Sequence, residues 1–509
     1  MLLARLVDVS AAMTATRARS AKIAALATLL RELAPDEVRV GVAYLTGELP
    51  QGRIGVGYAG VFGIEVEPAS ETSLTLAEVN ARFDELATMK GAGVAARRAA
   101  ALGGLFSKAT HAEQDFLKRL LVGELRQGAL EGVMTDAVAK AFEVKPELVR
   151  RAAMLEGNLG RVAEAVRLSG EGALATFKLE LLKPIGPMLA QSANSPSAAI
   201  EELGPAIFEH KLDGARVQVH KLGDDVRVFT RSLHDVSSRV PEIVEAIRAL
   251  PSRSLILDGE ALSLRPDGRP QPFQVSMRRF GRKLDDEKLR AELPLSAFYF
   301  DALHADGDDL IDRPALERRE ALAGMLPEPS RVPSIVTADA AEASAFLEAA
   351  LAAGHEGVMA KSGSAPYEMG RRGAAWLKVK RTHTLDLVVL AAEWGSGRRK
   401  GTLSNIHLGA RDPSNESFVM LGKTFKGMTD EMLAWQTERF LQLQLGREGH
   451  IVHVKPELVV EIAFDDVQAS SQYPGGVALR FARVKRYRPD KNARDADTID
   501  TVRALHVPV

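Results

Sequence analysis

The stretch Glu209-His-Lys-Leu-Asp-Gly-Ala-Arg216 runs directly into Val-Gln-Val-His-Lys221 near the middle of the chain. Lys211 precedes the turn-like tripeptide Leu-Asp-Gly, and the residues after that turn alternate between apolar and polar. Such alternation is typical of a strand whose successive side chains face opposite sides. A turn at Gly223-Asp224 then leads into the apolar run 226–230. The segment therefore predicts a β-hairpin that begins beside Lys211, within a domain that mixes strands and helices.

The hairpin also predicts an unusual arrangement of charge. Symmetric pairing about its turn sets Arg216 opposite Arg231, and two cations opposed across strands repel each other. A phosphate or carboxylate between them would relieve the repulsion, so we infer an anion site. A solvated hairpin whose arginines splay apart is the alternative. Neighbouring positive charge also favours the free amine of a lysine, which makes Lys211 a candidate nucleophile; an ordinary surface lysine is the other interpretation.

The composition of the whole chain limits its chemistry. The chain has 509 residues, of which 66 are basic and 67 acidic, a formal net charge of −1, and no cysteine. The lack of cysteine excludes disulfides, thiolate metal sites and cysteine nucleophiles. Any metal would be bound by oxygen or imidazole, which favours Mg²⁺ or Mn²⁺. No uninterrupted apolar run approaches the roughly 18 residues of a membrane-spanning helix, and the N-terminus has no signal-peptide pattern, so we expect a cytoplasmic protein.

The pattern of predicted helices and strands changes twice along the sequence, which predicts three domains. Apolar residues at helical spacing predict an all-α domain over 1–180, with helices at 21–33, 111–125, 133–142 and 148–165. The prolines of 182–187 lead into an α+β domain over 181–383, with strands at 215–221, 226–230, 254–257 and 298–303 and helices at 241–250, 314–324 and 340–353. Short strands and one helix at 430–445 make 384–509 typical of a small OB-type β-barrel.

Two carboxylates are candidate metal ligands, because each stands at the end of an expected strand. Glu260 closes the apolar run 255–260, which ends in Asp-Gly-Glu, and Glu356 opens the run 356–361. Carboxylate oxygens suit a hard cation or a ribose hydroxyl. An ordinary turn is the alternative at both places.

An aromatic strand and a basic strand add further candidates. Phe298 and Phe300 share one face of 298–301, so an aromatic ring could stack on a base there, although such residues more often form a core. Lys378 and Lys380 share one face of the strand 376–380 by the same period of two. These two ammonium groups repel each other unless an anion lies near, and a solvated strand face is the alternative.

Taken together, these segments resemble the ATP-dependent DNA ligases, which are covalent nucleotidyltransferases. The resemblance is greatest to the three-domain bacterial form with an N-terminal helical DNA-binding domain. It rests on the ordered segments 209–216, 230–231, 257–260, 298–301, 356–361, 376–380 and 480–491, and it extends over all three regions. It implies that the middle domain is an adenylation (nucleotidyltransferase) domain and that the C-terminal domain has the OB fold.

The resemblance implies a role for each matching residue. Lys211 would be the adenylated catalytic lysine, and Glu209 would read the adenine amino group. The other ATP- and AMP-binding positions would be Arg216, Arg231, Glu260, Phe300, Arg372, Lys378 and Lys380. The metal ligands would be Glu260 and Glu356. The residues that orient pyrophosphate would be Arg480, Arg483, Arg488, Asp490 and Lys491. Ala482 departs from the proline that is usual in the family.

Contacts with DNA are implied at three loops. The glycine-bearing loops 44–53 and 123–129 resemble those that bring backbone N–H groups to DNA phosphates, and 393–400 resembles a basic loop of the OB domain. The implied DNA-binding residues are Gly47, Arg53, Arg126, Gly128, Arg398, Arg399 and Lys400. Helix punctuation is the alternative for the glycines.

The implied activity is the sealing of nicks in double-stranded DNA with ATP and Mg²⁺ or Mn²⁺. Lys211 would take AMP from ATP, AMP would pass to the 5′-phosphate at the nick, and the 3′-hydroxyl would then attack that phosphate. Such an enzyme would act in the cytoplasm, at the nucleoid when bound, as a monomer that encircles DNA. An RNA ligase, a capping guanylyltransferase and a non-catalytic DNA-binding scaffold are the alternatives. The helical first third argues against a capping enzyme, and the presence of Lys211 and Glu260 argues against the scaffold.

DNA binding should weaken with salt in spite of the net charge of −1. Seven basic residues and one acidic residue stand between Arg480 and Arg494, so the average conceals segregated charge. Phosphate contacts made by such a cluster release counterions, and the affinity then falls as the salt concentration rises. Fluorescence anisotropy of a labelled nicked duplex measures this dependence. An affinity that stays flat between low and physiological salt would contradict the prediction.

Overall fold

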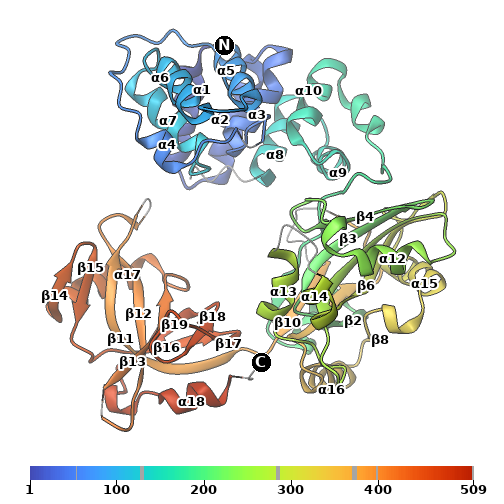
Figure 1. Cartoon of the computed structure of the whole chain (residues 1–509), viewed down its shortest axis with the longest axis vertical. Coiled ribbons are helices and arrows are strands. Elements are labelled where there is room, and N and C mark those ends of the chain that lie inside the picture. The colour runs from blue at the N-terminus through green and yellow to red at the C-terminus, as the bar shows by residue number, and fades with distance from the viewer. Residues whose placement is uncertain are drawn as a thin grey trace.

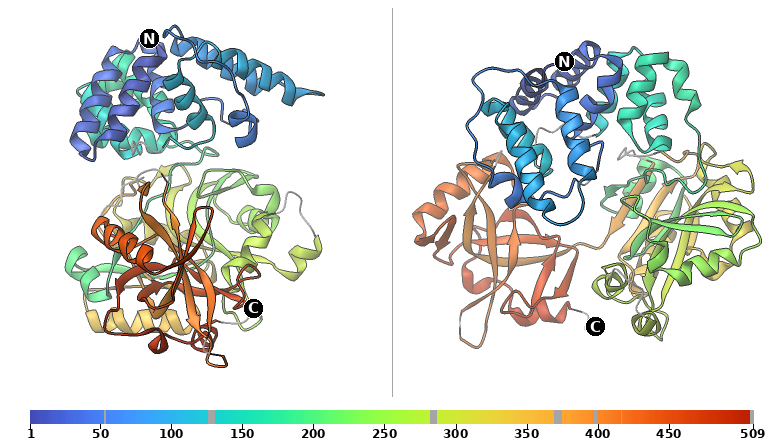
Figure 2. Two further views of the ribbon diagram at one scale, coloured as in Figure 1. Left: turned by 90° about the vertical axis from the view of Figure 1, so that its left-hand side faces the viewer. Right: turned by 45° about the horizontal axis from the view of Figure 1, so that its top comes forward.

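The computed structural model describes residues 1–52, 54–125, 131–281, 287–368, 375–396, 399–415 and 417–506. The ribbon divides into three bodies: a helical body with the N-terminus, a body of two sheets in the middle of the chain, and a C-terminal barrel (Figure 1). The helical body lies across one side of the other two (Figure 2).

The helical body packs around one apolar core. Its elements are α1 (Leu3–Ala15), α2 (Arg19–Glu32), η1 (Pro35–Glu37), α3 (Val38–Thr46), α4 (Tyr58–Phe62), α5 (Leu76–Thr88), α6 (Val94–Phe106), α7 (His111–Leu121), α8 (Glu131–Ala141), α9 (Pro146–Glu156), α10 (Leu159–Ser169) and η2 (Glu171–Thr176). Thr75 and Thr110 begin α5 and α7 with capping boxes, in which each hydroxyl accepts a hydrogen bond from a backbone N–H of the first turn. These N–H groups have no partner within their own helix, so the caps fix where the helices begin.

The predicted helices at 21–33, 111–125 and 133–142 are confirmed as α2, α7 and α8. The single helix predicted over 148–165 is wrong, because the chain forms α9 and α10 there. Gly157 between them has φ 71°, in the left-handed region that favours glycine, and Asn158 caps the start of α10. The apolar spacing continues across this break, which is why periodicity alone missed it.

The middle body contains two five-stranded sheets, ordered β1-β10-β9-β2-β8 and β4-β3-β5-β6-β7. Its strands are β1 (Gln191–Ala193), β2 (Ala206–Lys211), β3 (Ala215–Leu222), β4 (Asp225–Thr230), β5 (Ser254–Ser263), β6 (Leu295–Ala305), β7 (Asp308–Asp309), β8 (Ser334–Thr337), β9 (Gly357–Ser362) and β10 (Trp376–Lys380). Its helices are α11 (Pro196–Leu203), η3 (Ser237–Arg239), α12 (Pro241–Arg248), α13 (Phe273–Gly281), α14 (Glu287–Glu292), α15 (Ala315–Met325), η4 (Glu328–Ser330) and α16 (Ala340–Ala352).

Each sheet of the middle body buries both of its faces. Val217 and Val219 of β3 pack with apolar residues of α12 and α15, whereas Ile256 and Leu303 on the other face of their sheet pack with Trp376 of the second sheet. The predicted hairpin is confirmed, since β3 and β4 pair antiparallel in the expected register. An apolar cluster shared by the two sheets therefore holds them together, and residues of both sheets can line one site.

The C-terminal body is the predicted OB-type barrel. Its elements are β11 (His383–Trp394), β12 (Leu403–Arg411), β13 (Phe418–Thr424), α17 (Asp430–Gln442), β14 (Gln444–Glu448), β15 (Ile451–Val454), β16 (Val459–Phe464), β17 (Asp466–Ala469), β18 (Val477–Arg480), β19 (Arg483–Tyr487), η6 (Ala493–Asp495) and α18 (Ile499–Ala504). The long strand β11 pairs with β16 along its first half, with β15 along its second half, and with β12 on its other edge. One strand thus joins the parts of the barrel around a single apolar core.

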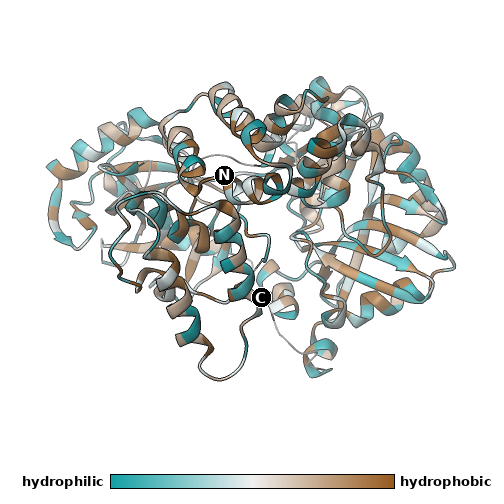
Figure 3. Ribbon diagram, turned by 90° about the horizontal axis from the view of Figure 1, so that it is seen from above, coloured by the Kyte–Doolittle hydropathy of each residue, from teal (hydrophilic) through white to brown (hydrophobic). Residues whose placement is uncertain are grey.

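Apolar and polar residues alternate along the ribbons of all three bodies (Figure 3). This mixing fits elements that bury one face and expose the other. No helix among the described residues is both long enough and apolar enough to cross a membrane.

Polar contacts join the helical body to the two-sheet body. Arg151 of α9 forms a bidentate ion pair with Asp312, with N–O distances of 2.5 and 3.0 Å. The connecting segment is held against β3, where the Gln218 side chain bonds the backbone of Ile185 and His220 accepts a hydrogen bond from the Leu182 N–H. The entry into the middle body is therefore fixed by buried hydrogen bonds.

Removing one partner of the buried ion pair between Arg318 and Asp301 should strongly destabilise the middle body. Arg318 is fully buried and donates to both carboxylate oxygens of Asp301 at 2.7 and 3.0 Å. Replacing Arg318 by Met leaves the Asp301 charge buried without its partner, which costs about 3–5 kcal/mol. Thermal unfolding should show a fall of about 6–20 °C in the melting temperature of this body.

The matched control is Arg313→Met, which removes an exposed ion pair with Asp308 at the start of the same helical segment. Exposed pairs contribute at most about 1 kcal/mol, so this variant should melt close to the wild type. Equal losses in the two variants would contradict the role assigned to the buried pair.

Candidate active site

One face of the sheet β1-β10-β9-β2-β8 gathers many of the predicted residues. Cross-strand register forms three rows: Lys211, Gly357 and Lys380; Glu209, Met359 and Lys378; and Ile207, Lys361 and Trp376. Residues directly opposite one another on neighbouring strands project from the same face. The side chains on this face of the three strands thus form one surface with one carboxylate, four lysines and one indole.

Lys211 ends β2, and its ammonium group contacts the Glu356 carboxylate, which stands just before β9. The backbone joins the same two residues, since the Glu356 N–H donates to the Lys211 carbonyl at 3.0 Å. Lys380 binds the same carboxylate oxygen at 2.8 Å. Burial favours the neutral acid, but the two lysines outweigh that effect, and the pKa of Glu356 lies below its usual value.

The second sheet brings Arg216 into the site from β3. Its guanidinium forms two hydrogen bonds with the Asp258 carboxylate of β5, at 3.0 and 2.6 Å, and one with the Met188 carbonyl at 2.6 Å. The Tyr367 hydroxyl donates to the same carboxylate at 2.6 Å. The guanidinium thus has a fixed position and a fixed direction before any ligand binds.

These contacts define the charged neighbours of Arg216 and Lys211. The extended register would indeed set Arg216 opposite Arg231, but β4 ends at Thr230 and Arg231 is exposed in the following turn. The Arg216 guanidinium binds the Asp258 carboxylate, and the anion site inferred between the two arginines stays a prediction. Likewise, the charged group that contacts Lys211 is the Glu356 carboxylate and not an arginine.

Glu260 lies opposite Arg216 in the register of β5 and β3, and its carboxylate accepts a hydrogen bond from the Gly214 N–H at 3.1 Å. Burial raises the pKa of Glu260 to about 7, against the opposing effect of Lys211 and Arg216. The prediction that the strand ends at Asp-Gly-Glu is wrong, because β5 continues to Ser263. The strand continues because Ala261 and Leu262 are apolar and fully buried. Glu356, in contrast, does stand at a strand start, as predicted.

Phe300 of β6 lies on the site side of its strand, while Tyr299 points into the core beneath. The Phe300 ring meets the Trp376 ring edge to face at 5.9 Å, and the Lys361 ammonium lies 4.6 and 4.4 Å from the two ring centroids. Lys361 forms an ion pair with Glu209 at 2.6 Å. An aromatic wall and a buried carboxylate therefore stand side by side, which suits a flat, polar-edged ring.

The barrel contributes Arg480, which binds the Asp213 carboxylate with an Nη2–Oδ1 distance of 3.1 Å. The Arg480 guanidinium also lies 4.5 Å from the Phe273 ring centroid and 4.0 Å from Glu356. Asp465 of the barrel binds Lys380 at 3.3 Å and Arg483 at 3.1 Å. The C-terminal body thus reaches the lysine that ends β2, although 267 residues separate Asp213 from Arg480.

The rest of the predicted C-terminal segment lies elsewhere in the barrel. Arg488 and Lys491 both bind Asp386 of β11, at 3.0 and 2.6 Å, and Arg488 also binds Asp490. In this arrangement only Arg480 and, through Asp465, Arg483 join the site. The role predicted for Arg488, Asp490 and Lys491 stays a prediction.

Three of the predicted DNA-binding residues, Gly47, Arg399 and Lys400, are among the described residues. Gly47 ends α3 in the left-handed region, with φ 82°, and is the C-cap of that helix. Arg399 donates a hydrogen bond to the carbonyl of the exposed Phe425, and Lys400 is exposed beside it. Arg53, Arg126, Gly128, Arg372 and Arg398 lie outside the described residues.

Sequence reasoning missed several residues of the site. Asp258, Tyr367, Lys361, Asp213 and Asp465 each bind a predicted residue through its charged or polar group. One signal was available for Asp258, because it stands two residues before Glu260 and hence on the same face of the strand. Tyr367 and Asp465 come from distant segments, and no local pattern marks them.

The site offers carboxylate oxygens, which are the type of ligand that binds a hard divalent cation. Glu356 remains ionised, and Mg²⁺ in nucleotide sites is held by one or two carboxylates together with phosphate oxygens and water. Glu260 offers a second oxygen ligand once it loses its proton. Among the described ranges, no three His, Cys, Asp or Glu side chains stand together as a closed metal site.

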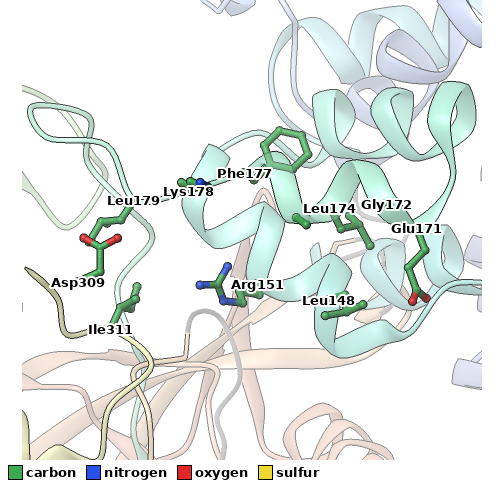
Figure 4. Close-up of a pocket in the computed structure, with 11 residues that line it drawn as sticks. Leu148, Arg151, Glu171, Gly172, Leu174, Phe177, Lys178, Leu179, Asp309 and Ile311 are labelled. Carbon is green, nitrogen blue, oxygen red and sulfur yellow. The ribbon is translucent and has the colours of Figure 1, made fainter.

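A cavity of about 680 Å³ lies apart from these residues, between the helical body and the middle body. Its lining includes Arg151, Leu174 and Phe177 on one side and Asp309 and Ile311 on the other (Figure 4). It shares no lining residue with the ion pairs around Lys211.

Comparison with known proteins gives consistent matches over the whole chain. The family pattern described as "ATP dependent DNA ligase domain" matches residues 187–380, "ATP dependent DNA ligase C terminal region" matches 399–491, and "DNA ligase N terminus" matches 64–139. A protein of Anaeromyxobacter sp. (strain Fw109-5), named "Probable DNA ligase", is 61% identical over 99% of this chain and 98% of its own length. A protein of the same name from Sorangium cellulosum (strain So ce56) is 58% identical over 99% of this chain and 95% of its own.

Two solved structures share the fold over nearly the whole length. The structure called "Pmar-Lig_Pre." has a TM-score of 0.65 at 19% identity and covers 95% of this chain and 99% of its own. The structure called "Pmar-Lig_PreS3" has a TM-score of 0.62 at 19% identity with the same coverage. At this identity the likeness concerns the arrangement of the three bodies and the fold of each.

Gly214, at the turn after Lys211, should tolerate no side chain. A Cβ there would lie 2.4 Å from the Ala261 carbonyl oxygen, so Gly214→Ala forces β3 away from β5 and breaks the contact with Glu260. We expect a loss of about 1–3 kcal/mol of unfolding free energy and faster hydrogen exchange of the residue 214 amide. Thermal melting and hydrogen-exchange mass spectrometry measure the two effects.

Gly223→Ala in the turn of the same hairpin is the matched control. Its φ of 58° is also strained for alanine, but no atom lies within 4 Å of the added Cβ. This change should cost about 1 kcal/mol and leave exchange at residue 214 unchanged. If the control also sped hydrogen exchange of the residue 214 amide, close approach of the strands would not be the reason for glycine at 214.

Proposed function

Since the chain belongs to the ATP-dependent DNA ligase family, we propose that it seals nicks in duplex DNA through a lysine–AMP intermediate on Lys211. The family membership makes the chain an enzyme of the covalent nucleotidyltransferase superfamily, one that uses ATP and joins DNA. The single observation that carries the finer proposal is the position of Lys211, at the end of β2 with its amine against Glu356 and among cationic side chains of both sheets.

In the first step, the Lys211 amine attacks the α-phosphorus of ATP. A P–N bond forms, the bond to the pyrophosphate oxygen breaks, the amine releases its proton, and AMP remains on the lysine. Negative charge grows on the phosphate oxygens during this transfer, so cations that are already in place stabilise it without rearrangement. Lys380, Arg216 and Arg480 are such cations, since each is already positioned by a carboxylate partner.

The remaining steps concern DNA. AMP passes from Lys211 to the 5′-phosphate at the nick, and the 3′-hydroxyl then attacks that phosphate, forms the phosphodiester bond and releases AMP. Arg480 binds Asp213, two residues after Lys211, so the barrel is joined to the turn that follows the lysine in this arrangement. The barrel must therefore move away before DNA can reach the AMP, which is a lid-type rearrangement.

Glu356 and Glu260 would hold a divalent cation, Mg²⁺ or Mn²⁺, with the phosphates of ATP completing the set. Such an ion, when bound, neutralises charge on the phosphate oxygens. The protein residues bring the substrate together: Glu209 reads the adenine amino group, Phe300 stacks on the base, and Arg216 and Lys380 bind ribose and phosphate. The proximity of Glu209 to Phe300, through Lys361, supports this division of roles.

Each body has a proposed part in binding DNA. Residues 1–180 bind the duplex, 181–383 carry the adenylation site and 384–509 close over it, so that a monomer encircles the nicked DNA. The arrangement of the helical body across the other two supports this proposal (Figure 2). The enzyme would act in the cytoplasm, at the nucleoid when bound to DNA.

Lys211→Ala should abolish transfer of label from α-labelled ATP to the protein, by more than about a thousandfold, because the nucleophile is gone. Lys211→Arg keeps the cation opposite Glu356 and should fail equally, which separates nucleophile loss from loss of the ion pair. The exposed Lys288→Ala should label normally. Labelling is scored on denaturing gels with Mg²⁺ present.

The same preparation tests the substrate. Wild-type protein with ATP and Mg²⁺ should join a nicked DNA duplex, and should prefer ATP to GTP and nicked DNA to nicked RNA. Labelled Lys211→Ala would disprove the intermediate. A wild-type protein that becomes labelled but joins only RNA would disprove the DNA substrate.

A further inference from the structure

Lys361 and Glu209 form a buried ion pair on the face of the sheet that also carries Lys211. Only 2% of Lys361 and 5% of Glu209 is exposed, and the Nζ–Oε2 distance is 2.6 Å. Lys361 lies opposite Ile207, one pleat away from Glu209, so the two side chains meet diagonally across β9 and β2. Burying a lysine and a carboxylate removes both from water, which is costly unless each compensates the other.

The lysine has further contacts that fix its position. Its ammonium donates to the Phe300 carbonyl at 3.1 Å and lies over the rings of Phe300 and Trp376, 4.6 and 4.4 Å from their centroids. The electron-rich faces of aromatic rings attract a cation at such distances, most strongly when water is excluded. Lys361 is therefore a fixed charge behind the aromatic wall, too deeply buried to reach a phosphate.

The Lys361 ammonium favours the ionised form of Glu209. Burial raises the pKa of Glu209, and Lys361 is the main group that opposes the rise. Arg319 of α15 opposes it as well, whereas Asp301 of β6 adds to it. A carboxylate without its proton only accepts hydrogen bonds, whereas a carboxylic acid can also donate one. The state of Glu209 thus decides which ring edges it can bind.

We propose that Lys361 is the positioning residue that makes the site prefer adenine, because it keeps Glu209 as a pure hydrogen-bond acceptor. This inference rests on the proposed function, in which Glu209 meets the 6-position of the base. Adenine has an amino group there, which donates to an ionised Glu209. Hypoxanthine and guanine have an oxygen at that position, which also only accepts, so a second acceptor opposite leaves both groups unpaired.

The test compares ATP with inosine triphosphate, which differs at the 6-position and at the neighbouring ring nitrogen. Wild-type protein, labelled with α-labelled ATP or ITP, gives the ratio of kcat/KM for formation of the lysine–nucleotide adduct. We expect a ratio of at least about a hundred in favour of ATP. In Lys361→Met, which keeps an apolar side chain against the rings, the ratio should fall at least about tenfold, because a buried Glu209 without its cation favours the protonated form.

The pH profile and two further variants separate this role from a general structural one. Raising the pH favours the ionised form of Glu209, so the ATP preference of Lys361→Met should increase with pH, with less change in the wild type. Lys361→Arg keeps the cation and should keep the preference. In a Glu209→Gln background, the Lys361→Met change should no longer alter the ratio, because the lysine acts through Glu209.

The experiment separates failure of the inference about Lys361 from failure of the proposed function. Wild-type protein that forms no adduct with ATP would overturn the proposed function itself. Normal ATP labelling together with an unchanged ATP-to-ITP ratio in Lys361→Met would overturn only the inference about Lys361. If Lys361→Met does not fold, Glu209→Gln alone decides: its ratio should fall by a similar factor, and an unchanged ratio overturns the proposal.

Discussion

Two lysines approach one carboxylate at the centre of the molecule, and that contact sets the geometry around it. Lys211 ends β2, Lys380 ends β10, and Glu356 stands before β9 between them. Without the carboxylate, the two ammonium groups, on the strands that flank β9, would repel each other. With it, the candidate nucleophile is held in one place, and the cation that would stabilise its reaction is held beside it.

The same rule governs the other charges of the site. Arg216 is bound by Asp258, Lys361 by Glu209 and Arg480 by Asp213, so each of these three cations has a carboxylate partner. Such pairs add little net stability, since desolvation offsets much of the attraction. Their consequence is a set of charges with fixed positions, and a site of this kind needs little reorganisation when phosphate charge arrives.

The contact between Arg480 and Asp213 gives the fold a second consequence. It joins the barrel to the residue two positions after Lys211. This one ion pair therefore both adds Arg480 to the site and holds the barrel beside it. A site that must later receive DNA requires this contact to break. The pair is half-buried rather than deeply enclosed, and the barrel's own core does not depend on it. Opening can therefore leave each body folded.

The sequence by itself determined the local elements and the face on which many of the predicted residues stand. The hairpin after Lys211, the shared face of Lys378 and Lys380, and the alternation of Phe298, Tyr299 and Phe300 all follow from the period of two of a strand. Apolar periodicity likewise placed α2, α7, α8 and α17. The helix prediction failed at Gly157, where α9 ends, because buried apolar residues continue on both sides of that break. The strand prediction failed at the end of β5, because buried residues continue beyond the Asp-Gly-Glu segment.

Only the tertiary structure decided which charges are partners. The local pattern predicted two arginines opposite each other with Lys211 beside them. In the folded chain, Arg216 forms an ion pair with Asp258 and Lys211 forms one with Glu356. These partners are 42 and 145 residues away along the chain. Periodicity fixes the direction of a side chain within its own strand, whereas the neighbour that it meets depends on how distant strands pair and how the two sheets and the barrel pack.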